Sequence, residues 1–78
     1  MNNIEELVRY IASSLVQDPD QVRVSAVDGE NAVVIELRVA PDDMGRVIGK
    51  QGRIAKAIRT VVKSATANEK KKYTVEIL

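Results

Sequence analysis

The chain has 78 residues, 45% of them apolar, and a net charge of +1, which suits a single domain spanning residues 1–78. It contains no cysteine and no histidine, which excludes disulfides, thiolate or imidazole metal sites, and the usual nucleophiles and general base of enzymes. We therefore expect a protein that is not an enzyme and that holds no cofactor or metal.

The charged residues are divided between the two halves of the chain. Residues 1–45 carry three basic and nine acidic side chains, a net charge of −6, whereas residues 46–78 carry nine basic and two acidic ones, a net charge of +7. A basic half beside an acidic half suggests one face that meets a polyanion. The N-terminal residues lack the basic and apolar stretches of a secretion signal, and no run approaches the roughly 18 apolar residues of a membrane span. We expect a cytoplasmic protein without a membrane segment.

The first half of the chain predicts a helix followed by a hairpin. Apolar residues recur at helical spacing over residues 4–17, and an Asp-Pro pair ends the pattern, which predicts an amphipathic helix with one buried stripe. Residues 22–26 and 33–39 then alternate apolar and polar side chains on either side of Asp28-Gly29. This pattern is typical of a β-hairpin with one apolar face.

The second half predicts two helices and a last strand. Pro41 stops the hairpin, and Asp42 is a candidate cap for a short helix that ends at residue 47 or 48. After two glycines the helical pattern returns from Arg53 to about Asn68, with one apolar side formed by Ile54, Ile58, Val61, Val62 and Ala65. A basic loop of three lysines follows, and residues 73–77 alternate as a strand. The expected fold is α+β with the element order α-β-β-α-α-β.

The most informative segment contains the loop Gly49-Lys50-Gln51-Gly52. Its two glycines let the backbone turn tightly, so a phosphate chain can come close to it. We expect the next helix to start at Gly52 and to point its unpaired amides and the positive end of its dipole toward the loop. Lys50 and Arg53 add full positive charges there. These features favour an anion, and a chain of phosphates suits them better than one carboxylate.

Other readings of the glycines are weaker. Glycines three residues apart are common in turns, but a turn does not require the apolar pair before this loop, the lysine within it or the basic helix after it. A phosphate-binding P-loop is excluded because only three residues separate Gly45 from Gly49-Lys50, and no Ser or Thr follows. A dinucleotide fingerprint needs a preceding strand. An RNA-recognition motif displays clustered aromatics, and this chain has only Tyr10 and Tyr73.

The run from Val47 to Ile54, an apolar pair followed by a GxxG loop and a helix, resembles the signature of KH domains. With this element order the resemblance is to the type II form, which implies a three-stranded sheet packed on one side by three helices, with the GxxG loop between the second and third helices. The resemblance covers essentially the whole chain, and the length is similar to that of the small bacterial single-KH RNA-binding proteins of the KhpA family. Membership of that family implies a homodimer, or a heterodimer with a larger KH-containing protein of the KhpB, Jag or EloR type.

The resemblance also implies a binding mode, in which the loop clamps the backbone of about four unpaired nucleotides and the bases lie in an apolar groove between the helices and the sheet edge. Arg59 and Lys63 are weaker candidates for the phosphate track, and the three lysines at 70–72 are expected to form a solvated turn. Ala55 stands where many KH sequences carry a branched apolar residue, which implies a shallow groove with little base selectivity. The candidate RNA-binding residues are Arg46, Val47, Ile48, Gly49, Lys50, Gln51, Gly52, Arg53, Ile54 and Lys56.

The leading hypothesis is a sequence-tolerant binder of single-stranded RNA, which the resemblance implies to act as a post-transcriptional regulator or RNA chaperone with a KH-containing partner. One alternative is a dimerisation or docking module with weak RNA binding, motivated by the apolar content of so small a chain. A second alternative takes residues 42–67 as a helix-turn-helix that reads duplex DNA.

Overall fold

The computed structural model describes residues 3–78, with side chains described from residue 4 onward. The elements follow the predicted order α-β-β-α-α-β, and short 3₁₀ turns at residues 19–21, 41–43 and 50–52 lie between them. The α+β class is therefore confirmed. The helices and strands are α1 (Asn3–Leu15), β1 (Arg23–Asp28), β2 (Ala32–Arg38), α2 (Met44–Ile48), α3 (Arg53–Ala65) and β3 (Lys72–Ile77).

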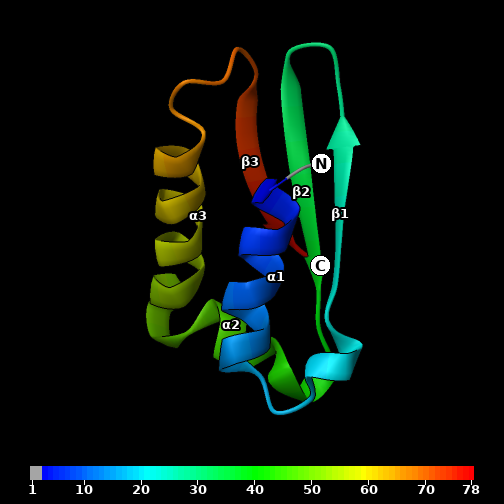
Figure 1. The fold of residues 1–78 in the computed structure, drawn as a ribbon. Helices are drawn as coiled ribbons and strands as arrows, with labels where there is room; N and C mark the ends of the chain where they lie inside the picture. The colour runs from blue at the N-terminus through cyan, green and yellow to red at the C-terminus, as the bar shows by residue number, and fades with distance from the viewer. Residues whose placement is uncertain (1–2) are drawn as a thin grey trace.

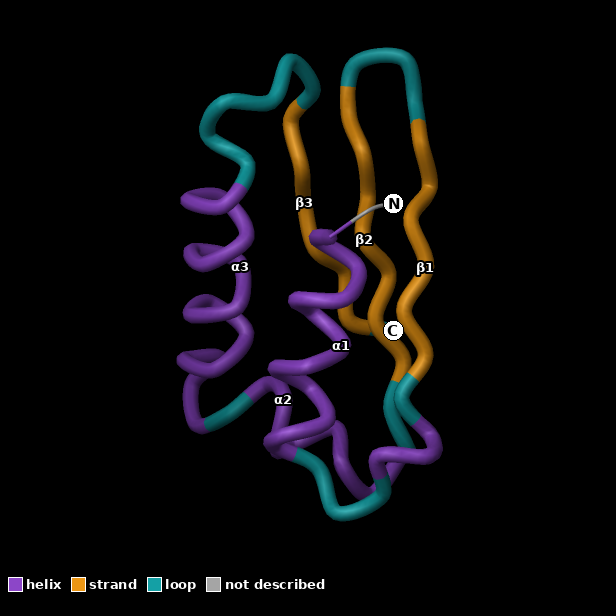
Figure 2. Tube along the Cα trace, viewed as in Figure 1, coloured by secondary structure: helices purple, strands orange, loops and turns teal. Residues whose placement is uncertain are grey.

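The three strands form one mixed sheet in the order β1-β2-β3. The hairpin pairs β1 with β2 antiparallel, whereas β3 runs parallel to β2. The three helices lie against the same face of the sheet, as in the predicted arrangement (Figure 1). α3 runs alongside β3, and the loop that joins them lies near the tip of the β1–β2 hairpin (Figure 2).

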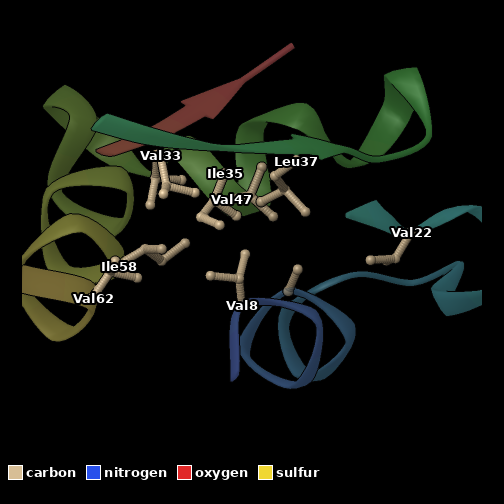
Figure 3. Packing of buried hydrophobic residues seen from close by; sticks show 10 residues of the cluster. Val8, Val22, Val33, Ile35, Leu37, Val47, Ile58 and Val62 are labelled. Carbon is tan, nitrogen blue, oxygen red and sulfur yellow. The ribbon is translucent and has the colours of Figure 1, made fainter. Parts of the chain in front are cut away.

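The core lies between the central strand and the three helices (Figure 3). Alternate residues of β2, namely Val33, Ile35 and Leu37, are buried on the helical face, because successive side chains of a strand point to opposite faces. They belong to one apolar cluster with helical residues, which are four positions apart in α1 and in α3. From the helices this cluster takes Val8 and Ala12 of α1, Val47 of α2, and Ile58 and Val62 of α3.

The buried stripe of α3 is narrower than the apolar side that its sequence predicts. Ile58 and Val62 are buried and Ile54 is half-buried, but Val61 and Ala65 are exposed. The apolar side that the sequence predicts is therefore only partly buried, because α3 contacts the sheet chiefly along β3. Both helices are also shorter at their C-terminal ends than predicted, since α1 ends at Leu15 rather than at residue 17 and α3 ends at Ala65 rather than near Asn68.

A buried carboxylate joins the end of α1 to the start of α2. Asp43, which is 2% exposed, accepts hydrogen bonds from the backbone amides of Gln17 at 3.0 Å and Asp18 at 3.1 Å. Arg46 Nε donates to the same carboxylate at 3.1 Å. The prediction that Asp42 caps α2 was wrong. Asp43 is the residue that precedes this helix, and its carboxylate accepts hydrogen bonds from the segment after α1.

These donors favour the ionised form of Asp43. The Gln17 amide lowers the pKa of this carboxyl below its ordinary value, and the Asp18 amide and Arg46 act in the same direction, while burial opposes them. The anion therefore fixes α2, and with it the start of the glycine loop, against α1.

Among residues 3–78, no helix has the length and apolar character that a bilayer span requires. The same residues contain no group of three or more acidic, His or Cys side chains placed to hold a metal ion.

Candidate nucleic-acid interface

The glycine loop folds as a tight turn between α2 and α3, with three residues at positive φ. Gly49 has φ 77° and ψ 171°, Gln51 has φ 58° and ψ 24°, and Gly52 has φ 75° and ψ 15°. The Gly49 conformation is one that residues with a Cβ essentially never adopt. Gln51 and Gly52 lie in the left-handed region, where a side chain costs about 1–2 kcal/mol.

Gly49 is also the point of closest backbone approach in the turn. A Cβ built on this residue would lie 2.3 Å from Cγ1 and 2.9 Å from the backbone N of Ile54. A Cβ on Gly52 would meet nothing within 4 Å. The first glycine is therefore required by packing and by backbone conformation, whereas the second is required by conformation alone.

Hydrogen bonds within the turn decide which amides can face a ligand. The Gly49 amide donates to Gly45 O at 2.8 Å, the Gly52 amide to Gly49 O at 3.1 Å, and the Arg53 amide to Lys50 O. These three amides are therefore occupied. Within residues 3–78 the amides of Lys50 and Gln51 have no hydrogen-bond acceptor, so they are the candidate donors of this turn for an anion. α3 begins at Arg53 rather than at Gly52, one residue later than expected.

The structure separates the candidate residues into an exposed set and a supporting set. Lys50, Gln51, Arg53 and Lys56 are exposed, and Gly49 and Gly52 are half-buried. These residues bring two lysines, an arginine and the turn backbone to the start of α3, where a phosphate chain can reach all of them.

The apolar candidates and Arg46 are more constrained. Val47 is fully buried, Ile54 packs partly buried against the core, and Ile48 is 37% exposed. The Arg46 side chain is 45% exposed, and its bond to Asp43 already neutralises part of its charge. Ala55 is buried. Of the three apolar side chains proposed for a base groove, only Ile48 offers an open surface.

A groove of about 600 Å³ lies between the C-terminal half of α3 and the edge strand β3, two elements that run side by side (Figure 1). Its lining contains five basic side chains and one acidic one. Such a groove carries a positive potential along one wall and a strand backbone along the other. The lining residues are Arg59, Lys63, Thr66, Ala67, Glu69, Lys70, Lys71, Lys72, Tyr73, Thr74 and Val75.

Sequence reasoning underrated this groove. Lys70–Lys72 were expected to form a solvated turn, and Lys70 and Lys72 are indeed exposed. The same segment also lines the groove with Arg59 and Lys63, because β3 pairs parallel with β2 next to α3. Lys72 begins β3 rather than ending the loop. The sequence does contain a signal for the groove. Arg59 and Lys63 lie four residues apart on the helix, and a second basic cluster, Lys70–Lys72, follows it.

An ion pair fixes the far end of the groove. Lys71 Nζ lies 2.6 Å from Asp28 Oδ1 and donates to Gly29 O at 2.9 Å. These contacts tie the loop after α3 to the β1–β2 hairpin, in the region where the two loops meet in Figure 2. The pair leaves Lys70 and Lys72 as the unpaired lysines of this segment in the described part of the chain.

Comparison with known proteins gives a full-length match. Residues 5–77 match the family model described as KhpA/KhpB, KH domain. The chain is 59% identical over 75 residues to the RNA-binding protein KhpA of Clostridium acetobutylicum and 60% identical over 75 residues to that of Clostridium perfringens, covering 96% of this chain and 100% of each relative. It is 46% identical over 78 residues to the RNA-binding protein KhpA of Aquifex aeolicus, covering 100% and 99% of the two chains.

Solved structures of the protein Era share the fold. The crystal structure of a single-substitution variant of Aquifex aeolicus Era bound to GDP·AlF₄⁻ superposes with a TM-score of 0.64 at 23% identity, covering 96% of this chain and 29% of that one. A structure of Era in complex with MgGDPNP and nucleotides 1506–1542 of 16S ribosomal RNA gives a TM-score of 0.58 at 24% identity, with 95% and 28% covered. The present chain therefore corresponds to under a third of these proteins, and the likeness concerns the fold alone.

Proposed function

This chain belongs to the KhpA/KhpB family of KH domains, and we propose that it binds single-stranded RNA through the Gly49–Gly52 loop and the groove between α3 and β3. The observation that carries the proposal is the arrangement of one tight turn with exposed residues Lys50 and Gln51 at the start of α3 and one basic groove along its C-terminal half. The clostridial relatives are RNA-binding proteins of the KhpA type, which supports the same role. The proposed role is binding without catalysis in the cytoplasm.

In this proposal the loop holds phosphates and the groove holds the strand that follows. The amides of Lys50 and Gln51 and the side chains of Lys50, Arg53 and Lys56 contact the backbone, because charge-assisted hydrogen bonds to phosphate oxygens are the strong ones. α3 has 13 residues and is about 20 Å long, so an unpaired strand that leaves the loop runs along the helix toward Arg59 and Lys63.

Reversing the charge of the loop tests this assignment. The variant Lys50→Asp/Gln51→Asp should bind an unpaired oligoribonucleotide at least about tenfold more weakly, since a charge-assisted hydrogen bond contributes about 1.5–3 kcal/mol. Asp tolerates the left-handed conformation required at position 51, so the fold should survive. Fluorescence anisotropy measures the affinity, and circular dichroism checks the fold.

A control with the same change in charge removes the effect of net charge. Gln21 and Arg38 are exposed and lie outside the loop and groove, so Gln21→Asp/Arg38→Asp should retain most of the affinity. Equal losses in the two folded variants would assign the effect to net charge and defeat the proposed site. For about four contacted phosphates the logarithm of the affinity should fall with the logarithm of the salt concentration with a slope of about −3.

A role in pairing is the second candidate function, and exposed apolar side chains favour it. On the helical side of the molecule Tyr10 is 74% exposed, Val61 is 43% exposed and Ile48 is 37% exposed, and the family includes KhpB as well as KhpA. Pairing with a second copy or with a larger KH-containing protein would cover these residues. Sedimentation at micromolar concentration with and without RNA separates a pairing module from an RNA binder. Competition by duplex DNA against an unpaired RNA tests the helix-turn-helix alternative.

A further inference from the structure

The groove wall formed by β3 is an open sheet edge, so its backbone N–H and C=O groups are available to form hydrogen bonds with the bases of a bound strand. β3 is the last strand in the order β1-β2-β3. The amides of Lys72 and Leu78 donate toward β2, to Asn31 O and Leu37 O. Because backbone groups alternate in direction along a strand, the backbone groups of Tyr73, Val75 and Ile77 face the other way, toward the groove and α3.

Such outward groups can read sequence. An unpaired N–H or C=O on a sheet edge is a template for any partner with matching donors and acceptors, and the edges of unstacked bases provide them. A free carbonyl on the groove wall would accept a hydrogen bond from an exocyclic amino group of a base. It would therefore favour adenine, cytosine or guanine over uracil, which lacks this donor.

Here the central carbonyl of the edge is already occupied. Arg59 Nε donates to Val75 O at 3.2 Å, and both residues line the groove. A carbonyl oxygen has a second lone pair, but a base amino group that approached it would bring its positive N–H end beside the guanidinium. The bond therefore replaces an acceptor by a fixed positive charge at the end of the groove that lies away from Lys70–Lys72.

We propose that Arg59 suppresses base discrimination by holding the Val75 carbonyl, so that the groove is selective for the phosphate backbone rather than for the amino groups of bases. This inference rests on the proposed function and concerns the specificity of the same site. Arg59 has two roles in it: its terminal nitrogens contact the backbone of the strand, and its Nε removes the acceptor. Deleting the side chain should weaken binding and at the same time introduce a preference.

The test compares two RNA probes that differ by one functional group per base. An oligomer of eight adenosines carries the N6 amino group, and an oligomer of eight purine ribonucleosides lacks it. The wild type should bind the two within about twofold. Arg59→Met frees the carbonyl, and the affinity ratio should shift by about two- to tenfold toward adenosine, the range expected for one net hydrogen bond.

Lys63→Met is the matched control. It removes the same charge from the same groove wall, one helical turn further on, and Lys63 has no recorded bond to the Val75 carbonyl among the described residues. It should weaken binding to both probes equally and leave their ratio at the wild-type value. Anisotropy titrations of the three proteins at one salt concentration give the ratios, and circular dichroism checks each fold.

The outcomes separate the inference from the proposed function. A wild type that binds neither probe overturns both. A wild type that prefers adenosine tenfold overturns the inference alone, whatever the variants do. If all three proteins bind and Arg59→Met has the same ratio as Lys63→Met, the carbonyl is not what limits discrimination, and the inference fails while RNA binding stands.

Discussion

The first glycine of the loop offers a prediction whose size follows from the structure. Gly49→Ala places a Cβ 2.3 Å from Ile54 Cγ1 and 2.9 Å from the Ile54 backbone N, at a φ of 77°. The strained backbone costs about 1–3 kcal/mol, and the forced displacement of a packed residue costs about 1–3 kcal/mol more. The total is about 2–6 kcal/mol. A chain of 78 residues has a free energy of unfolding of about 4–12 kcal/mol, so this one methyl group removes a large part of it.

Two other glycines serve as controls, because Gly52 lacks the close contact of Gly49 and Gly45 lacks both that contact and the positive φ. Gly52 shares the positive φ of 75° but its added Cβ meets nothing within 4 Å, so Gly52→Ala should cost only about 1–2 kcal/mol. Gly45 lies in α2 with nothing near its added Cβ and no positive φ, so Gly45→Ala should stabilise by about 0.5–1 kcal/mol.

Urea unfolding followed by circular dichroism measures all three variants. With an m-value of about 1 kcal/mol/M for a domain of this size, each kcal/mol moves the midpoint by about 1 M. The expected order of midpoints is Gly45→Ala above wild type, then Gly52→Ala, then Gly49→Ala. A Gly49→Ala midpoint equal to or above that of Gly52→Ala would refute the claim that close packing against Ile54 fixes this turn.

Three further predictions concern the support of the site. The lowered pKa of Asp43 contributes stability above the unfolded pKa of about 3.9, and this stability is lost as the pH falls through the folded pKa. Asp43→Asn should therefore lower the melting temperature at pH 6 and flatten the fall of the melting temperature below about pH 4. Asp42→Asn should leave the dependence of the melting temperature on pH unchanged. Asp28→Asn removes an exposed ion pair and should cost under about 1 kcal/mol, so a loss of 2 kcal/mol in urea unfolding would contradict the account of that contact. Ile35→Val deletes one methyl group from the fully buried centre of β2 and should cost about 0.5–1.5 kcal/mol; no measurable change would mean that the core packs elsewhere.

The sequence predicts the parts of this protein that local chemistry determines. The strands, the hairpin turn at Asp28-Gly29 and the turn at Gly49–Gly52 all follow from alternation and from glycine, because the residues that decide them are neighbours in the chain. The exposure of Lys50 and Gln51 at the loop tip follows for the same reason.

Features that depend on distant residues could not be predicted in this way. The donors to Asp43 lie 25 and 26 positions earlier, so a local pattern suggested a helix cap at the neighbouring Asp42 instead. The groove exists only because β3 pairs parallel with β2 beside α3, which no spacing within residues 53–78 reveals. Val61 has the helical spacing of a core residue but faces outward, because the neighbouring elements cover a narrower stripe of α3 than its apolar side provides.

The most direct test is a titration of the ¹⁵N-labelled protein with an unpaired oligoribonucleotide at low ionic strength. The proposed site predicts amide shift changes at Lys50 and Gln51 and along the facing segments of α3 and β3, with the uncovered face of the sheet unchanged. Saturable binding that leaves the resonances of residues 49–52 unmoved would contradict the central claim that this turn holds the phosphate backbone.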